Sequence, residues 1–272
     1  MNSQVLPQKI IGWDTSSLNG VIVAGEWTDQ SFRVIETIRP SLQRSSHSER
    51  LLWAIDSVLK SCAWKIEDVD GIAVGVGPGS FTGIRIGLVT AKTLAQVLGK
   101  PIYPISSLAL SARPAARTLH KTGHSIPVLA TSNAAKGEHY FLIGKNAESI
   151  LNCIHPQTHD FTGLWSPDGV EGVGTVHEVA KAFEQSAEHA VEVAVLDGDL
   201  KKLLPEAILS RQIPQDLKFE ALGQDLMEMA WQLFRRGLFC RFDSVHPRYL
   251  RDSDAEVRLK KGIIARAPLS PS

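Results

Sequence analysis

One short stretch in the first third of the chain constrains the fold more than any other. Residues 71–76 (GIAVGV) are a continuous apolar run of the kind found in a central strand of a parallel sheet. A loop with two glycines and a proline follows, and a helix is predicted from about residue 83 to residue 98. A buried strand that leads through a tight turn into a helix indicates an α/β fold.

The loop itself is a candidate anion site. Gly77, Gly79 and Ser80 precede a helix start, where backbone N–H groups and the positive helix end favour a phosphate. The alternative is a tight turn without a ligand, in which Ser80 caps the helix. A dinucleotide fingerprint would need glycine at Thr82, and the GK[ST] ending of a Walker A loop is absent. A hydrolase elbow would need glycine at Pro78. Ser80 is therefore predicted to be a helix cap and not a nucleophile.

A second weak candidate for nucleotide binding follows the first predicted strand. Asp14, Thr15 and Ser16 stand where a carboxylate and two hydroxyls could approach a phosphate or its magnesium. The same residue types form Asx turns that satisfy only their own backbone. Both interpretations stay open at this stage.

The remaining pattern suggests two similar halves. The chain opens with three predicted strands and an amphipathic helix. The strand, loop and helix described above come next, and a further strand and a helix after Ser106 follow them. These first elements are predicted at 9–14, 20–27, 32–38, 48–62, 71–76, 83–98 and 101–105. A similar order follows at 126–132, 138–145, 149–154, 170–173, 177–187, 191–196 and 222–236, with 149–154 as a strand. The order predicts two related lobes.

Two helices carry candidate interface residues. In the first, apolar residues recur at helical spacing, and in the second, small residues recur at every fourth position. The first set is Leu51, Leu52, Ile55 and Leu59, and the second is Gly83, Gly87, Ala91 and Ala95. A stripe of small residues lets another backbone approach closely. That backbone belongs either to the protein's own sheet or to a helix of another chain, and we expect the latter.

Several segments resemble one protein family. They are IIGWDTSS from residue 10, HSERLL from residue 47, GPGSFTGIRIG from residue 77 and PRYLR from residue 247, and together they span nearly the whole chain. They are similar to the TsaB family, the dimerisation subunits of bacterial tRNA threonylcarbamoyladenosine synthesis. The resemblance implies the actin-like, sugar-kinase-like (ASKHA) fold of two ribonuclease-H-like lobes. The expected division is a first lobe at 1–113, a degenerate second lobe at 114–251 and a loose tail at 252–272.

The resemblance also implies a function. TsaB-like proteins pair with the catalytic subunit TsaD and with the ATPase TsaE, and they contact tRNA only through that complex. We therefore expect a scaffold without catalytic residues or a cofactor of its own, and a homodimer as a further possibility. The alternatives are a stand-alone enzyme of the same fold, either a metallopeptidase or a small-molecule kinase, and a self-associating regulator.

The chain departs from its relatives at two places. The family's second lobe usually carries an acidic-led DAR.GEVY string, whereas this chain has Asn133 and Ala135 there and keeps only Glu138 and Tyr140. This departure weakens any prediction of a charged ligand in that lobe.

The second departure concerns metal ligands. The resemblance to TsaD aligns Ser107 and Ser111 with the two histidines of a metal motif, and hydroxyls are poor ligands for iron or zinc. The histidine pairs 120/124 and 155/159 do not lie on uninterrupted helices. No metal site is predicted.

Composition sets the remaining limits. Lysine plus arginine equals aspartate plus glutamate at 29 each, so no overall charge draws the chain to nucleic acid or to an acidic membrane. Three widely spaced cysteines, Cys62, Cys153 and Cys240, suit a reducing compartment. With no signal-peptide pattern and no long apolar run, we expect a cytoplasmic protein without membrane contact.

Overall fold

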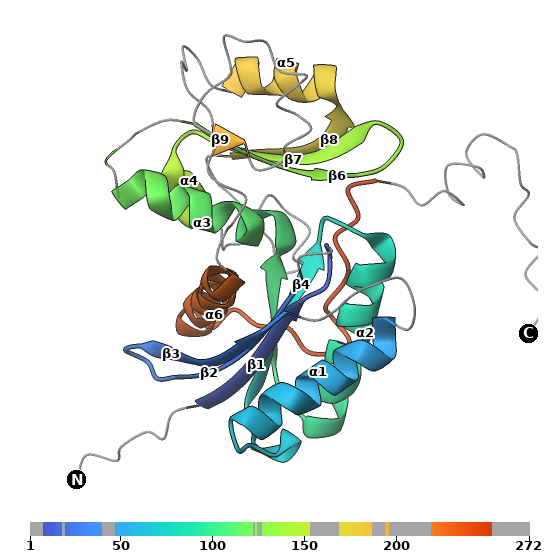
Figure 1. Ribbon diagram of the computed structural model, residues 1–272, viewed down its shortest axis with the longest axis vertical. Coiled ribbons are helices and arrows are strands. Elements are labelled where there is room, and N and C mark those ends of the chain that lie inside the picture. The colour runs from blue at the N-terminus through green and yellow to red at the C-terminus, as the bar shows by residue number, and fades with distance from the viewer. Residues whose placement is uncertain are drawn as a thin grey trace, which may run out of the picture.

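The computed structural model describes residues 8–17, 20–39, 47–121, 123, 127–152, 169–186, 194–195 and 219–251. Two sheets with flanking helices form two lobes, drawn one above the other in Figure 1. The elements of the first half are β1 (Gln8–Asp14), β2 (Val21–Trp27), β3 (Phe32–Ile38), α1 (His47–Ser61), a 3₁₀ turn (Ile66–Asp68), β4 (Gly71–Gly77), α2 (Phe81–Leu98), β5 (Ile102–Ser106) and α3 (Ser107–Lys121). Those of the second half are β6 (Val128–Asn133), β7 (Glu138–Gly144), α4 (Ala147–Leu151), β8 (Gly169–Thr175), α5 (Val176–Ser186), β9 (Ala194–Val195) and α6 (Phe219–Arg235).

The first sheet has the strand order β3-β2-β1-β4-β5. β1, β2 and β3 form an antiparallel meander, and β4 and β5 add parallel strands beside β1. Every residue of β4 is buried, as its continuous apolar run predicts for a strand covered on both faces. β3 at the edge alternates between half-buried and exposed residues over most of its length.

Helices cover both faces of this sheet. A side chain added at Gly12 of β1 would meet Leu226 of α6, whereas its neighbour Trp13 donates a hydrogen bond to the Gly87 carbonyl of α2. Because successive strand residues point to opposite faces, α6 and α2 lie on opposite sides of the sheet. α1 lies beside α2, and α3 joins α6 on the other side (Figure 1).

The second sheet repeats this arrangement in the order β8-β7-β6-β9. Again the first strand pairs antiparallel with the second and parallel with the strand that follows the helix, here β9 after α5. Leu129 and Phe141 of the sheet pack with Phe183 of α5 in a small separate core. The second half inserts α4 between its second and third strands but otherwise follows the first half, with three strands, a helix and a strand parallel to the first, and this confirms the predicted fold of two related α/β lobes.

Two details differ from the sequence-based expectation. The predicted strand at 149–154 is wrong, because residues 147–151 form α4, whose start is capped by Asn146 Oδ1 accepting from the Ser149 N–H at 2.9 Å. The division at 113/114 falls inside α3, which continues through Pro114. α6 and the segment after it contact the first sheet, although they follow the second lobe in sequence. The predicted loose tail at 252–272 lies outside the described residues.

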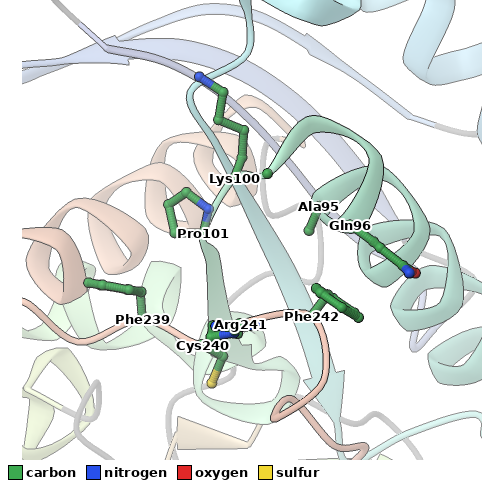
Figure 2. A pocket seen from close by; sticks show the side chains of 9 residues that line it. Ala95, Gln96, Lys100, Pro101, Phe239, Cys240, Arg241 and Phe242 are labelled. Atoms are coloured by element: carbon green, nitrogen blue, oxygen red, sulfur yellow. The ribbon is translucent and has the colours of Figure 1, made fainter.

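A cavity of about 340 Å³ opens at the lower end of the first lobe, shown in Figure 2. It lies between the C-terminal end of α2, the start of β5 and the segment that follows α6. In that segment the backbone of Cys240 pairs with Ile102, donating and accepting one hydrogen bond each. The turn from α2 into β5 is made by Gly99, whose φ of 67° is left-handed and ends the helix.

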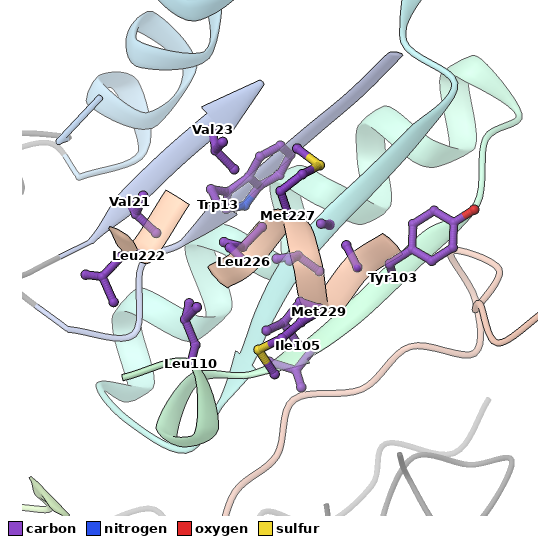
Figure 3. Packing of buried hydrophobic residues seen from close by; sticks show 14 of the residues in the cluster. Trp13, Val21, Val23, Tyr103, Ile105, Leu110, Leu222, Leu226, Met227 and Met229 are labelled. Carbon is purple, nitrogen blue, oxygen red and sulfur yellow. The ribbon is translucent and has the colours of Figure 1, made fainter. Parts of the chain in front are cut away.

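The main core extends over both faces of the first sheet, and Figure 3 shows the part of it between the sheet and α6. Leu222, Leu226 and Met229 of α6 pack with residues such as Tyr103 and Ile105 of β5. Burial of this apolar surface is the dominant stabilising term of the lobe. None of the described helices is long and apolar enough to cross a membrane.

Candidate functional site

The turn after β1 holds the three residues considered for nucleotide binding. Asp14 Oδ1 accepts hydrogen bonds from the Ser16 backbone N–H at 2.8 Å and from the Ser16 hydroxyl at 2.6 Å, which is an Asx turn. The Thr15 hydroxyl donates to the Gly83 carbonyl of α2 at 2.7 Å. All three residues are buried. The two hydroxyls are therefore engaged within the protein and the turn is an Asx turn, whereas Asp14 Oδ2 is buried without a hydrogen-bond partner among the described residues.

The glycine- and proline-containing loop folds directly onto this turn. The Ser80 N–H donates to the Ser16 carbonyl at 2.7 Å, and the Gly77 N–H donates to the Ser107 hydroxyl at 3.1 Å. A Cβ added at Gly79 would lie 2.6 Å from the Ser16 carbonyl oxygen, and the φ of Gly79 is +157°. The two candidate phosphate-binding segments are thus brought together, which the sequence did not predict. They pack directly against each other.

The start of α2 is capped by a residue of the same loop. Ser80 is its N-cap, and the Ser80 hydroxyl accepts from the Gly83 N–H at 3.3 Å. This confirms the prediction of a capping serine. An anion at this helix end would compete with that cap, and the N–H groups of Gly77, Ser80 and Gly83 already have acceptors inside the protein.

The stripe of small residues on α2 packs inward. A Cβ at Gly83 would lie 2.0 Å from the Thr15 carbonyl oxygen, and one at Gly87 would lie 2.4 Å from the Thr15 hydroxyl. Gly87, Ala91 and Ala95 are buried. The expectation that this stripe meets another chain is therefore wrong, because its small residues are required for the close approach of α2 to the protein's own β1 turn.

The four apolar residues proposed on α1 do not all face the same way. Leu51, Ile55 and Leu59 are buried in the core, so the prediction that they face a partner is also wrong for the free chain. Leu52 is 53% exposed and Trp53 is 71% exposed. On the outward side of α2, Val89 and Val97 are 61% and 77% exposed. We call these four residues, Leu52, Trp53, Val89 and Val97, the outer face.

The outer face carries little charge along α2. Among the exposed positions of that helix, only Arg85 is charged, and the others are threonines, valines and Gln96. On α1 the exposed Asp56 and Lys60 form an ion pair at 2.6 Å beside the two apolar residues. The four exposed apolar side chains stand on two helices that contact each other, and exposed apolar surface of this kind is typical of a protein-protein contact. Sequence periodicity could not find this face, because the inward residues give the stronger pattern.

The second lobe offers a different turn at the corresponding place. Asn133 Oδ1 accepts from the Ala135 N–H at 2.6 Å, so this strand also ends in an Asx turn. Ala135, Lys136 and Gly137 all have positive φ and lead straight into β7. Of the two residues that match the family string, Glu138 forms an ion pair with Arg251 at 2.8 Å, and Tyr140 is buried, which raises its pKa.

Residues 245–251 form a strap between the lobes. The Arg248 N–H donates to the Val76 carbonyl of β4, while the Arg248 guanidinium pairs with Glu171 of β8 at 2.6 Å. Burial raises the pKa of Glu171, although the Arg248 charge acts against this. Arg251 adds the contact with Glu138. The sequence marked PRYLR as a family segment but gave no sign of Glu171 as its partner.

A second polar network, also missed from the sequence, joins α3 to α6. The Arg113 side chain is 1% exposed and contacts the fully buried Asp225 at 3.3 Å and Glu228 at 2.9 Å. Arg117 pairs with the same two carboxylates. The two arginines lie over a hundred positions before the two acids in sequence, so periodicity carries no signal for their contact.

The positions considered for metal binding hold hydroxyls with other partners. Ser107 accepts from the Gly77 N–H, and Ser111 donates to the Leu108 carbonyl at 2.8 Å. Among the described residues, no group of three histidine, cysteine, aspartate or glutamate side chains could hold a metal ion. His124, His155, His159 and Cys153 lie outside them. Burial raises the pKa of the Cys240 thiol to about 12, so it is protonated and unreactive at neutral pH.

Comparison with known proteins gives a consistent picture. Residues 29–259 match the family model described as TsaD: tRNA N6-adenosine threonylcarbamoyltransferase. The tRNA threonylcarbamoyladenosine biosynthesis protein TsaB of Escherichia coli is 27% identical over 225 residues, which are 78% of this chain and 84% of that protein. The tRNA N6-adenosine threonylcarbamoyltransferase of Brucella ovis is 28% identical over 204 residues, 71% of this chain but only half of that protein. A crystal structure from Pseudomonas aeruginosa, of an uncharacterized protein with similarity to peptidase YEAZ, covers 90% of this chain and all of its own at 23% identity, with a TM-score of 0.61.

Proposed function

Because this chain belongs to the TsaD family and is a TsaB-type protein of tRNA threonylcarbamoyladenosine biosynthesis, we propose that it serves there as a non-catalytic subunit that docks onto a TsaD-type partner. The observation that carries the proposal is the outer face, with its four exposed apolar residues on α1 and α2. The partner would cover this face with helices of its own. Two helices from each chain would then form a four-helix contact.

The composition of the outer face supports docking of this kind. Tryptophan is enriched among the residues that dominate binding energy at interfaces, and Trp53 is the most exposed aromatic side chain of the described residues. Full burial of a valine or leucine side chain contributes about 1.5–3 kcal/mol. Four such residues can therefore drive association without any movement of the buried stripe.

The closed loop supports the non-catalytic part of the proposal. A kinase or ATPase needs phosphate-binding N–H groups that are free to receive the nucleotide. Here the loop packs on the Asp14–Ser16 turn, and hydroxyls stand at both positions of the metal motif. We propose that the chain binds no metal or nucleotide of its own at this loop and that a TsaE-type ATPase supplies nucleotide chemistry in the assembled complex. Since the chain has no net charge, tRNA would be contacted through that complex.

The test compares single substitutions on the outer face with one elsewhere. We expect Trp53→Ala to weaken association with the TsaD-type subunit of the same cell at least about tenfold, measured by calorimetry. Ile35→Ala is the matched control, because Ile35 is 38% exposed on the edge strand β3, away from the outer face. Its affinity should stay within about threefold of the unmodified chain.

Sedimentation of the isolated chain separates this proposal from self-association. A homodimer that dissociates with Trp53→Ala would mean that the outer face also binds a second copy, with which a TsaD-type partner competes. Equal affinities for both variants would contradict the docking proposal. ATP hydrolysis by the isolated chain, abolished by Asp14→Ala, would contradict the non-catalytic role.

A further inference from the structure

The cavity in Figure 2 is separate from every feature used so far. The glycine-containing loop follows the C-terminal end of β4, whereas the cavity adjoins Pro101, just before the N-terminal end of the parallel strand β5. The two therefore lie at opposite edges of the first sheet. At about 340 Å³ the cavity is at the lower end of the range for small-molecule sites.

The cavity has an apolar lining. Phe239 and Phe242 come from the segment after α6, and Pro101 and Ala95 complete the apolar surface. Ala95 in the last turn of α2 and Gly99 directly after the helix are small, so they leave space where larger residues would fill it. Phe239 is 55% exposed although it is aromatic, so part of its ring is accessible to a ligand. Such a lining suits a flat aromatic group.

The polar groups of the lining define the charge of the ligand. They are the amide of Gln96 and the cations of Lys100 and Arg241, and no carboxylate is among the lining residues. Cys240 adds no charge, because burial raises the pKa of its thiol to about 12. Lys100 and Arg241 pair with Asp70 at 3.1 Å and Asp243 at 3.6 Å. Both acids are substantially exposed, and exposed pairs of this kind exchange partners at little cost.

We propose that this cavity binds a small aromatic carboxylate, with the ring against Phe239 and Phe242 and the carboxylate paired with Arg241. A guanidinium suits this role, because its planar donors match a carboxylate in a bidentate pair. The Arg241 side chain is 75% exposed, so it can turn toward a ligand without loss of core packing. The site is independent of the outer face and of the docking proposal.

The experiment uses two probes that differ in charge alone. Indole-3-acetate and its neutral amide, indole-3-acetamide, are titrated into the full chain labelled with ¹⁵N, and amide shifts are followed by NMR. For a ligand of this size we expect a Kd of about 1 mM or below for the acid. The amide should bind at least about fivefold more weakly, because it lacks the charge that pairs with Arg241.

Three variants locate the binding. Arg241→Gln should remove the difference between acid and amide, and Phe239→Ser should weaken both probes about tenfold. Thr93→Ala is the control, since Thr93 is exposed on α2 but does not line the cavity. All three side chains are exposed, so melting curves should show that the variants fold.

The proposal has clear contrary outcomes. It is overturned if neither probe shifts the amides around Gln96, Gly99 and Phe239 up to about 10 mM. It is also overturned if Thr93→Ala abolishes binding, which would place the probe elsewhere on α2. If indole-3-acetate still binds more tightly than indole-3-acetamide to the Arg241→Gln variant, Arg241 is not the partner of the carboxylate.

Discussion

The two lobes share one order of elements but end their first strands in different surroundings. In both, an Asx turn follows the first strand, formed by Asp14 in the first lobe and by Asn133 in the second. The Asp14 turn is buried under the glycine-containing loop, and the Ser80 N–H of that loop donates a hydrogen bond to the Ser16 carbonyl. Asn133 and the turn that follows it stay exposed and lead directly into β7.

The difference shows how much the surroundings of one turn can change while the turn itself stays the same. In the first lobe the glycine-containing loop packs on the turn. In the second lobe an amide replaces the family's aspartate, and among the described residues the turn is contacted by Arg251, which donates to the Ala134 carbonyl.

The largest expected effect concerns the ion-pair network that joins α3 to α6, since α3 also packs against α4 and β6 of the second lobe. Asp225→Ala leaves the buried Arg113 guanidinium without one of its two acids, and removal of one partner of a buried pair costs about 3–5 kcal/mol. We expect the urea midpoint to fall accordingly, for probes in both lobes. Asp243→Ala, which breaks an exposed pair, is the control and should change stability by less than about 0.5 kcal/mol. A loss below about 1 kcal/mol in Asp225→Ala would mean that the lobes do not depend on this network.

A smaller effect, confined to the first lobe, is expected from Gly83→Ala. The new Cβ would lie 2.0 Å from the Thr15 carbonyl oxygen, and overpacking typically costs about 1–3 kcal/mol. Hydrogen exchange should become faster in β1 and α2 but not in β6, β7 or β8. Thr82→Ala, at the exposed neighbouring position, should leave exchange unchanged. If Gly83→Ala instead weakened partner binding at full stability, the stripe would belong to an interface after all.

The smallest effect is a pH dependence that distinguishes two glutamates of the second lobe. Burial raises the pKa of Glu171 in the folded state, so its contribution to stability is present at low pH and is lost as the pH rises through that raised value. Hydrogen bonds from Thr175 lower the pKa of Glu178, so its contribution is present at neutral pH and is lost as the pH falls. Relative to the unmodified chain, Glu171→Gln should therefore gain stability as the pH rises from about 4 to 7, and Glu178→Gln should lose it. Urea unfolding across this range tests both signs, and slopes of equal sign would contradict the assignment.

Much of the architecture was predictable, because it rests on local patterns. The buried run before Gly77, the capping Ser80 and the spacing of Leu51, Ile55 and Leu59 each specify an element from its own residues. The strand predicted at 149–154 failed because an apolar run of five or six residues fits a short helix equally well, and the Asn146 cap decided the matter.

The site was harder to predict, because it depends on whether the residues of a pattern point into the protein or toward solvent. The stripe from Gly83 to Ala95 correctly indicated a close backbone approach, yet periodicity cannot distinguish the protein's own β1 turn from another chain. Exposed residues such as Trp53 and Val97 follow no repeat and become visible only once the core is assembled. The pairing of Arg248 with Glu171 is a contact between distant segments and left no local trace.

The position of α6 has a consequence for synthesis of the chain. The helix that covers one face of the first sheet is encoded after the entire second lobe, so that face has no α6 until residues 219–235 have left the ribosome. Until then the apolar surface around Tyr103 and Ile105 lacks the leucines and methionines that cover it in Figure 3. Transiently exposed surface of this kind binds chaperones and promotes aggregation. A nascent chain arrested before residue 219 should therefore be a chaperone client, whereas one released after residue 251 can close both lobes.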